Sequence, residues 1–151
     1  MCLTTLTKTN KTITEGYKCF EKVPWHNYQL DNIHQYIDNL EINKWLKARQ
    51  QLIHIDEFDF KSESYMSGFH FFETLYDARI YTNELRCTGI IIKKILVQDI
   101  TASGTQKTFF KTISGDQIIH LPCHIAFKML ILPGDYQTCF TEPDIFLPRR
   151  R

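Results

Sequence analysis

Apolar and polar residues alternate in several parts of the chain in a way that predicts β-strands. Alternation of this kind predicts strands over residues 13–20, 108–113, 116–120 and 124–132, with breaks at Ser114-Gly115 and at Leu121-Pro122-Cys123. The apolar run at residues 90–97 predicts a central, buried strand. Residues 101–106, rich in Ser, Thr and Gly, are predicted to form a turn. The pattern indicates a strongly bent sheet that is mixed or mostly antiparallel.

Helical spacing of apolar residues is clearest just after the middle of the chain, where it predicts a helix over residues 75–86. Thr74 precedes this stretch as an N-cap, and Asp77 three residues later completes a weak capping-box pattern. Residues 31–52 are ambiguous, because their helical spacing breaks in the middle. A helix interrupted by a turn, or a short pair of strands, fits this second region. The predicted fold class is α+β.

Length and composition predict one folded domain over residues 1–132, followed by an extended C-terminal tail over residues 133–151. The chain has 151 residues, of which 43% are hydrophobic and 23% charged, as in ordinary globular proteins. The net charge is +1, and without Arg149–Arg151 there are 15 basic residues against 17 acidic. This balance argues against a nucleic-acid partner. No apolar run reaches the roughly 18 residues of a membrane span, so we expect a soluble protein without membrane contact.

Cysteine, histidine and glycine usage excludes several kinds of site. The five cysteines are odd in number and form no Cys-x-x-Cys pair, which favours a reducing intracellular compartment. The segment His120-Leu-Pro-Cys-His124 has metal-capable side chains but no matching second ligand pair, so no metal is predicted. The glycines are scattered singly, which excludes the P-loop and the dinucleotide fingerprint. No cofactor is predicted.

The segment from Tyr65 to Tyr81 has the highest density of aromatic residues in the chain. It also contains His70, the best candidate for a ligand-binding residue. In a strand, the side chain of His70 points opposite to those of its two phenylalanine neighbours. Gly68 permits a close approach of the backbone. His70 is either a ligand-binding or basic group, or a core histidine bonded to a carbonyl, and the sequence leaves both open. No motif names a reaction, and the sequence leans away from an enzyme.

Several segments together resemble a group of small proteins of bacteriophages and large DNA viruses that share a Gly-Phe-His core motif. The similar segments are Gly16-Tyr-Lys-Cys-Phe20, Tyr65-x-x-Gly-Phe-His-x-Phe72 with the later Ala78, and Thr101-Ala-Ser-Gly-Thr-Gln106. This resemblance covers about two thirds of the chain. It implies a viral protein located in the host cytoplasm or in the virion.

A more distant resemblance is to ADP-ribosyltransferases of the poly-ADP-ribose-polymerase type. Gly68-Phe-His-Phe with Ala78-Arg-Ile-Tyr81 is similar to the strand and helix that line the nicotinamide pocket of that family. The resemblance implies an ADP-ribosyltransferase-like fold. In it, His70 takes the place of the pocket tyrosine of the family, Tyr81 that of a second aromatic ring, and Asp116 that of the catalytic glutamate. The His-Gly motif of the family would fall at Tyr17-Lys18, where this chain has neither residue. The resemblance thus implies binding without turnover.

Three functions follow as hypotheses. The first is a pocket for a nucleotide-like or nicotinamide-like ligand, bound without turnover. Its predicted ligand-binding residues are Tyr17, Lys18, Gly68, His70, Tyr81, Asp116 and Gln117. The second is an interaction or virion-associated protein that binds a protein partner or itself through exposed aromatics such as Trp25 and Tyr28, or through the C-terminal tail. The third is an active ADP-ribosyltransferase.

Overall fold

The computed structural model describes residues 3–8, 11–23, 29–32, 40–55, 63–85, 90–112 and 114–138. Within these ranges the chain is mostly β-sheet, with one α-helix of seven residues or more. The elements in chain order are β1 (Thr5–Leu6), β2 (Glu15–Val23), β3 (Gln29–Asn32), β4 (Trp45–Lys47), β5 (Leu52–Ile55), β6 (Glu63–Met66), β7 (Phe69–Phe71), α1 (Leu75–Leu85), β8 (Ile90–Thr112) and β9 (Gly115–Ile131).

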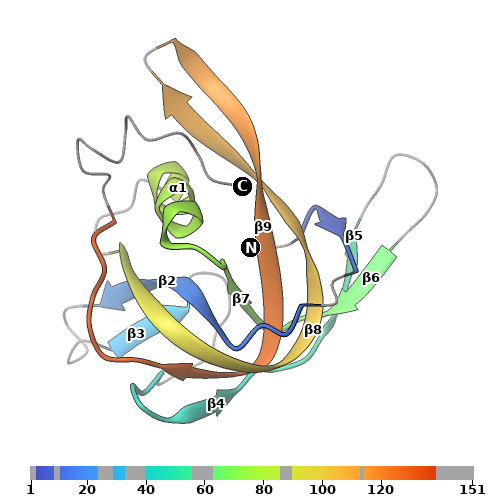
Figure 1. The fold of residues 1–151 in the computed structure, drawn as a ribbon, viewed down its shortest axis with the longest axis vertical. Helices are drawn as coiled ribbons and strands as arrows, with labels where there is room; N and C mark the ends of the chain where they lie inside the picture. The colour runs from blue at the N-terminus through green and yellow to red at the C-terminus, as the bar shows by residue number, and fades with distance from the viewer. Residues whose placement is uncertain are drawn as a thin grey trace.

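The centre of the fold is a long antiparallel hairpin formed by β8 and β9 (Figure 1). Its ladder runs from Ile95 opposite Ile131 to Thr112 opposite Gly115, with a register shift between Ile100 and Ala102. The strand order is β3-β2-β8-β9-β4, while β1 also pairs with β8 and β7 also pairs with β9. β5 and β6 form a separate two-stranded sheet.

A backbone bridge between Tyr17 and Phe72 joins β2 to the end of β7. Each of these two residues donates its N–H to the carbonyl oxygen of the other, with both N–O distances at 2.8 Å. Because β2 pairs with β8 and β7 pairs with β9, the bridge closes the four strands into a ring. Gly16 permits this contact, since a Cβ there would lie 2.3 Å from the Phe71 ring and 2.7 Å from the Phe72 carbonyl oxygen.

The buried side chains form two clusters. One contains Phe20, Phe69, Phe71, Ile95 and Met129, all fully shielded from solvent. In the other, the α1 side chains Ala78, Ile80 and Tyr81 pack with residues of β2, β8 and β9. The alternation of β2 assigns Phe20 to the first cluster and Cys19 to the second. This confirms the strand predicted at residues 13–20.

Helix α1 confirms the helix predicted over residues 75–86. Thr74 caps it, because its Oγ1 accepts a hydrogen bond of 3.1 Å from the backbone N–H of Asp77. In the ranges that the structure describes, no helix has the length and apolar character of a membrane span.

The predicted α+β class is wrong, because strands dominate the fold and it is nearly all β. In the ambiguous range 31–52, the described residues include the end of β3 and all of β4, and none is helical. The described residues form strands rather than a helix, but β3 pairs with β2 and β4 pairs with β9, so they do not form the short pair of strands predicted as the alternative. The adjoining residues 33–39 lie outside the described part.

Two breaks predicted in the second half of the chain are also wrong. The predicted turn at residues 101–106 lies inside β8, and Pro122 lies inside β9. Gly104 is needed there because β1 crosses it closely: a Cβ would lie 1.8 Å from the carbonyl oxygen of Thr5. Glycine and proline usually interrupt strands, but Gly104 and Pro122 each occupy a strand position that tolerates that residue type.

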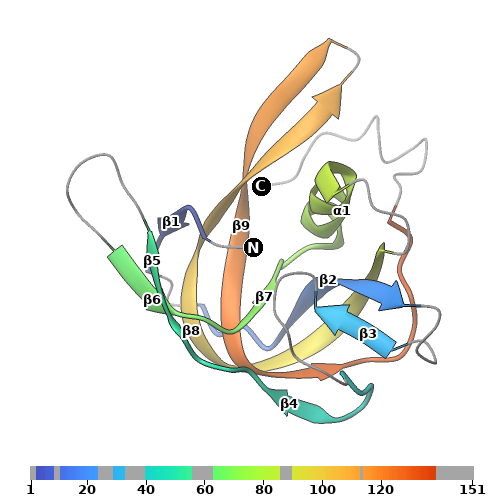
Figure 2. The same cartoon turned by 180° about the vertical axis from the view of Figure 1, so that it is seen from behind.

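Beyond the main body, the β8–β9 hairpin continues as a projecting two-stranded ribbon (Figures 1 and 2). We call residues 106–112 and 115–121 the arm. β1 leaves β8 at Thr105, and β7 leaves β9 at His124. Past these points, the described part of the chain supplies no third strand to the arm.

Candidate functional site

Four of the predicted ligand-binding residues lie at the seam where β2, β7 and β9 meet. The Nζ of Lys18 donates a hydrogen bond of 2.7 Å to the backbone carbonyl oxygen of His70, and both residues are buried. Tyr17 pairs with the neighbouring Phe72. Gly68 does permit a close approach, since a Cβ there would lie 2.5 Å from the carbonyl oxygen of Ala126.

The other three predicted residues occupy two different places. Tyr81 on α1 is buried near the seam, with its ring centroid 5.4 Å from that of Phe72. Asp116 and Gln117 are exposed at the tip of the arm. Gln117 is eight residues along β9 from Ile125, the residue opposite His70, a separation of roughly 26 Å along the strand. The structure therefore brings five of the seven residues together and separates two.

Lys18 is a buried cation whose charge interacts with two buried thiols, those of Cys19 and Cys123. Burial lowers its pKa to about 8, while the nearby Cys19 and Cys123 act in the opposite direction. Burial raises the pKa of the Cys19 and Cys123 thiols to about 12. At neutral pH both thiols are thus protonated and closed to solvent, which makes them poor nucleophiles. The hydrogen bond to His70 compensates the ammonium group.

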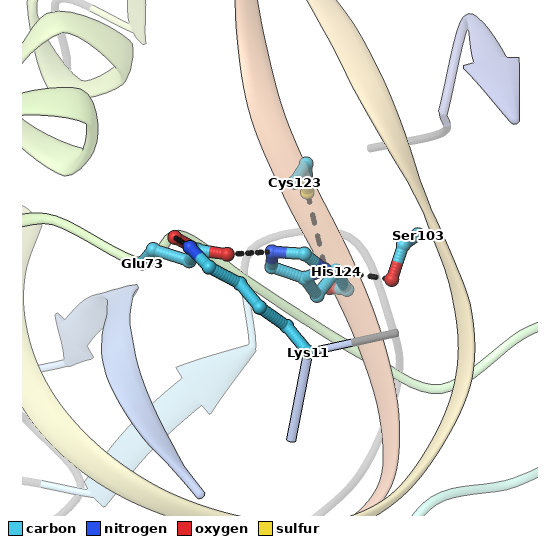
Figure 3. Close-up of polar contacts among 5 residues, drawn as sticks. All are labelled: Lys11, Glu73, Ser103, Cys123 and His124. Atoms are coloured by element: carbon cyan, nitrogen blue, oxygen red, sulfur yellow. Dashed lines mark hydrogen bonds and ion pairs between the residues drawn. The ribbon is translucent and has the colours of Figure 1, made fainter. Parts of the chain in front are cut away.

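A second polar group links four segments through His124 (Figure 3). Ser103 lies directly opposite His124 in the β8–β9 ladder, and its Oγ is 2.7 Å from the Nδ1 of the ring. The Nε2 of His124 is 2.8 Å from Oε1 of Glu73, which follows β7. The other Glu73 oxygen is 3.2 Å from the Nζ of Lys11. Side-chain exposure falls from 71% at Lys11 to 30% at Glu73 and 7% at His124.

The charges of this group fix the direction of its hydrogen bonds. Burial lowers the pKa of His124, and the hydrogen bond and charge of Glu73 oppose that shift. Partial burial of Glu73 acts to raise its pKa, but the hydrogen bonds from His124 and Lys11 outweigh it and the pKa is lowered. At neutral pH the carboxylate can only accept, so Nε2 donates to Glu73 and Nδ1 accepts from the Ser103 hydroxyl.

The order serine, histidine, carboxylate is also the order found in nucleophilic catalysis. Ser103 is only 5% exposed, however, and its backbone carbonyl accepts a hydrogen bond from Thr7 beside β1. The burial of Ser103 and the hydrogen bond between its hydroxyl and His124 favour a structural role. In the described ranges, no three His, Cys, Asp or Glu residues are placed to hold a metal ion.

Sequence reasoning missed this group because its members are far apart along the chain. His124 is 21 residues from Ser103 and 51 from Glu73. In the sequence, His124 stands out only as a metal-capable side chain, and Ser103 lies in a predicted turn. One signal in the sequence could have found the group. If residues 90–112 and 115–131 are paired as a single hairpin, Ser103 falls opposite His124.

Glu73→Gln is expected to lower the pKa of His124 further, because the carboxylate raises it. Lys11→Met is the matched control and should raise the same pKa, since the Lys11 charge lowers it. A titration of the His124 ring by NMR measures both shifts. Shifts in the same direction for the two variants would contradict the proposed arrangement.

The arm presents a mixed apolar and polar surface on one face. Phe109 and Ile118 are directly opposite each other, with 44% and 54% of each residue exposed. Lys107 and His120 form the next pair on this face, and the Nζ of Lys107 lies 5.6 Å from the centre of the Phe109 ring. The opposite face is covered near the body, where Thr108 and Leu121 are fully buried, and open at the tip, where Gln117 is exposed. The sequence predicted the two strands but not which face is exposed.

Comparisons with protein families, with curated proteins and with solved structures find no match to this chain. The two resemblances drawn from the sequence therefore stay predictions.

Proposed function

We propose that this protein functions by association, binding a second copy of itself through the exposed face of the arm. The observation that carries the proposal is the cross-strand pair Phe109 and Ile118, two large apolar side chains exposed on a projecting ribbon. Burying each such side chain is worth about 1.5–3 kcal/mol. Placing both on an arm rather than in the core favours an interface role.

The backbone of the arm supports the same proposal. A two-stranded ribbon has two outer edges, and unpaired strand edges readily accept a strand from another chain. In the described part of the chain, neither edge of the arm pairs with a further strand. An edge and an apolar face together offer both backbone hydrogen bonds and side-chain burial.

Residues 135 and 136, in the first part of the predicted tail, contact the body of the fold, which favours the arm over these residues as the interface. Asp135 forms an ion pair of 2.8 Å with Lys93, and Tyr136 donates its N–H to the carbonyl of Ile92. The ring of Tyr136 also packs edge-on against Tyr17. These residues hold the tail to the body. Trp25, Tyr28 and the rest of the tail lie outside the described residues.

A nucleotide-like or nicotinamide-like ligand stays a prediction, and the same holds for transferase activity. Of the three candidates for stacking and hydrogen bonding, His70 and Tyr81 are buried and Tyr17 is partly exposed. The two candidates for a ribose contact, Asp116 and Gln117, lie on the arm. This distribution favours association over a ligand pocket.

Sedimentation velocity over a concentration series tests the association. We expect wild type to show a mass that rises with concentration up to about 1 mM, where a contact worth about 4 kcal/mol is half formed. Phe109→Ser and Ile118→Ser should each abolish the rise. Leu52→Ser is the matched control, because Leu52 is 52% exposed but lies on β5. A wild type that stays monomeric, or a loss only in the control, would overturn the proposal.

A further inference from the structure

We infer that the two copies join edge to edge along β9 of the arm, antiparallel and centred on Ile118. This inference rests on the proposed self-association and specifies its geometry. The result would be a four-stranded ribbon in the order β8-β9-β9-β8. Three features of the arm select this arrangement over its alternatives: the direction of the backbone groups, the match of side chains, and the charge along each edge.

Pro122 reveals which backbone groups face the open edge of β9. It lies opposite Thr105 in the ladder with β8. Proline has no N–H to donate, so it fits a strand where its nitrogen faces away from the paired neighbour. Orientation alternates along a strand, so Ile118, four residues earlier, has the same orientation. Its N–H and C=O therefore face the open edge, ready for a reciprocal pair with Ile118 of the second copy.

Side chains match best when the two-fold axis passes through Ile118. Ile118 then meets its own copy, and Asp116 meets His120 of the second copy at both ends. All of these side chains are exposed. Phe109 lies beside Ile118 in each copy, so one face acquires a row of four apolar side chains. A carboxylate opposite an imidazole is complementary in hydrogen bonding, because the carboxylate oxygens accept and a ring N–H donates.

Neighbouring registers lose this match. Centring the axis on Gln117 would put Asp116 opposite Ile118, and centring it on Ile119 would put Ile118 opposite His120. Each pairs an apolar with a polar side chain, and a one-residue slip also turns the outward backbone groups. Using the β8 edge centred on Phe109 would place the lysine positions 107 and 111 opposite each other, an unfavourable pair of like charges.

Disulfide formation tests the register directly. Directly opposite residues in a hydrogen-bonded antiparallel pair have Cα atoms about 5.5 Å apart, within the range of a disulfide. Under mild oxidation we expect Ile118→Cys to form a covalent dimer. Lys107→Cys is the matched control: it is exposed on β8 outside the apolar pair, and two further strands separate it from its copy, so the distance is at least about 14 Å. Wild type gives the background from the native cysteines. Equal dimer yield from the two variants would overturn the register.

A charge exchange tests the same geometry in solution. Asp116→Lys should weaken association at least several-fold, because the new lysine faces His120 of the second copy. Adding His120→Asp to that variant should restore it, since the pair is again complementary. Failure of the double variant to recover would count against the Asp116–His120 contact.

The two levels of the proposal can fail separately. If association depends on Phe109 and Ile118 but Ile118→Cys does not link preferentially, the arm is the interface and the register is wrong. If wild type remains monomeric at every concentration, the register and the proposed function both fail. Circular dichroism of each variant, with the wild-type spectrum expected for these exposed positions, confirms that folding is retained.

Discussion

Phe71→Ala is expected to lower the free energy of unfolding by about 3–5 kcal/mol, as is typical when a buried aromatic ring is removed. Phe71 is fully buried in β7, opposite His124, and the centroids of their rings are 5.5 Å apart. Its neighbour on the other side is Gly16, which has no side chain that could fill the space. The void would lie beside the bridge that closes the sheet, so the cost should be near the upper end.

Urea unfolding measures this effect, and Phe109→Ala is its control. Phe109 is the same residue type on the exposed face of the arm, and its replacement should change stability by less than about 0.5 kcal/mol. Measurements belong at low protein concentration, where the proposed association does not contribute. Similar losses for the two variants would contradict the assignment of Phe71 to the closing seam.

A double-mutant cycle with Gly16→Ala makes the test specific to that seam. Alone, Gly16→Ala should destabilise the fold, because its Cβ would lie 2.3 Å from the Phe71 ring. With Phe71→Ala already present the ring is gone, and the second change should cost less. The Phe72 carbonyl oxygen, 2.7 Å away, keeps part of the penalty. Strict additivity of the two changes would contradict direct contact.

The elements predicted correctly depend on signals carried by nearby residues. The Thr74 cap and the apolar spacing after it define α1 within a dozen positions. Alternation around Cys19 defines both faces of β2, because each face packs into its own cluster. The close approach at Gly68 also followed from local reasoning, since only glycine fits where a carbonyl lies 2.5 Å from its Cβ position.

The features that were missed depend on contacts between distant parts of the chain. Gly104 reads locally as a turn, yet its small size serves the crossing of β1, about 100 residues away. A proline reads as a break, yet Pro122 fits because its side of β9 is open at that point. Alternation in the arm shows that two faces exist, but only the assembled fold shows which is covered. The predicted fold class was wrong for the same reason. Pairing between strands that are distant in the sequence closes the sheet, and local propensity does not show which strands pair.

Alkaline pH is expected to unfold the protein through the buried thiols of Cys19 and Cys123. The pKa of Cys19 and Cys123 rises from an ordinary value of 9.0 to about 12 in the folded state. Above pH 9 the unfolded state loses these protons and the folded state keeps them, so stability falls as the pH rises. Each pKa unit corresponds to about 1.4 kcal/mol, so either thiol alone costs about 4 kcal/mol by pH 12, and the two together cost less than twice that because Cys123 contributes to the raised pKa of Cys19.

Lys18 acts in the opposite direction over a lower range of pH. Its pKa falls from 10.5 to about 8 in the folded state, so the folded state releases this proton first. Its contribution to stability rises between pH 8 and 10.5 and reaches about 3 kcal/mol. The sum predicts a slight gain in stability between pH 8 and 9, then a steady loss. Urea unfolding at half-unit steps from pH 7 to 11 measures this profile.

Variants separate the two contributions by the slope of stability against pH rather than by its absolute value. Lys18→Met should remove the gain between pH 8 and 9 and steepen the loss from pH 9 to 10.5. Cys19→Ala with Cys123→Ala should instead leave only the gain from Lys18 among these three groups. A double cysteine variant with the wild-type loss above pH 9 would show that the thiols at the seam are not the cause. The same result would mean that Cys19 and Cys123 titrate alike in the folded and unfolded states, contrary to their burial around Lys18.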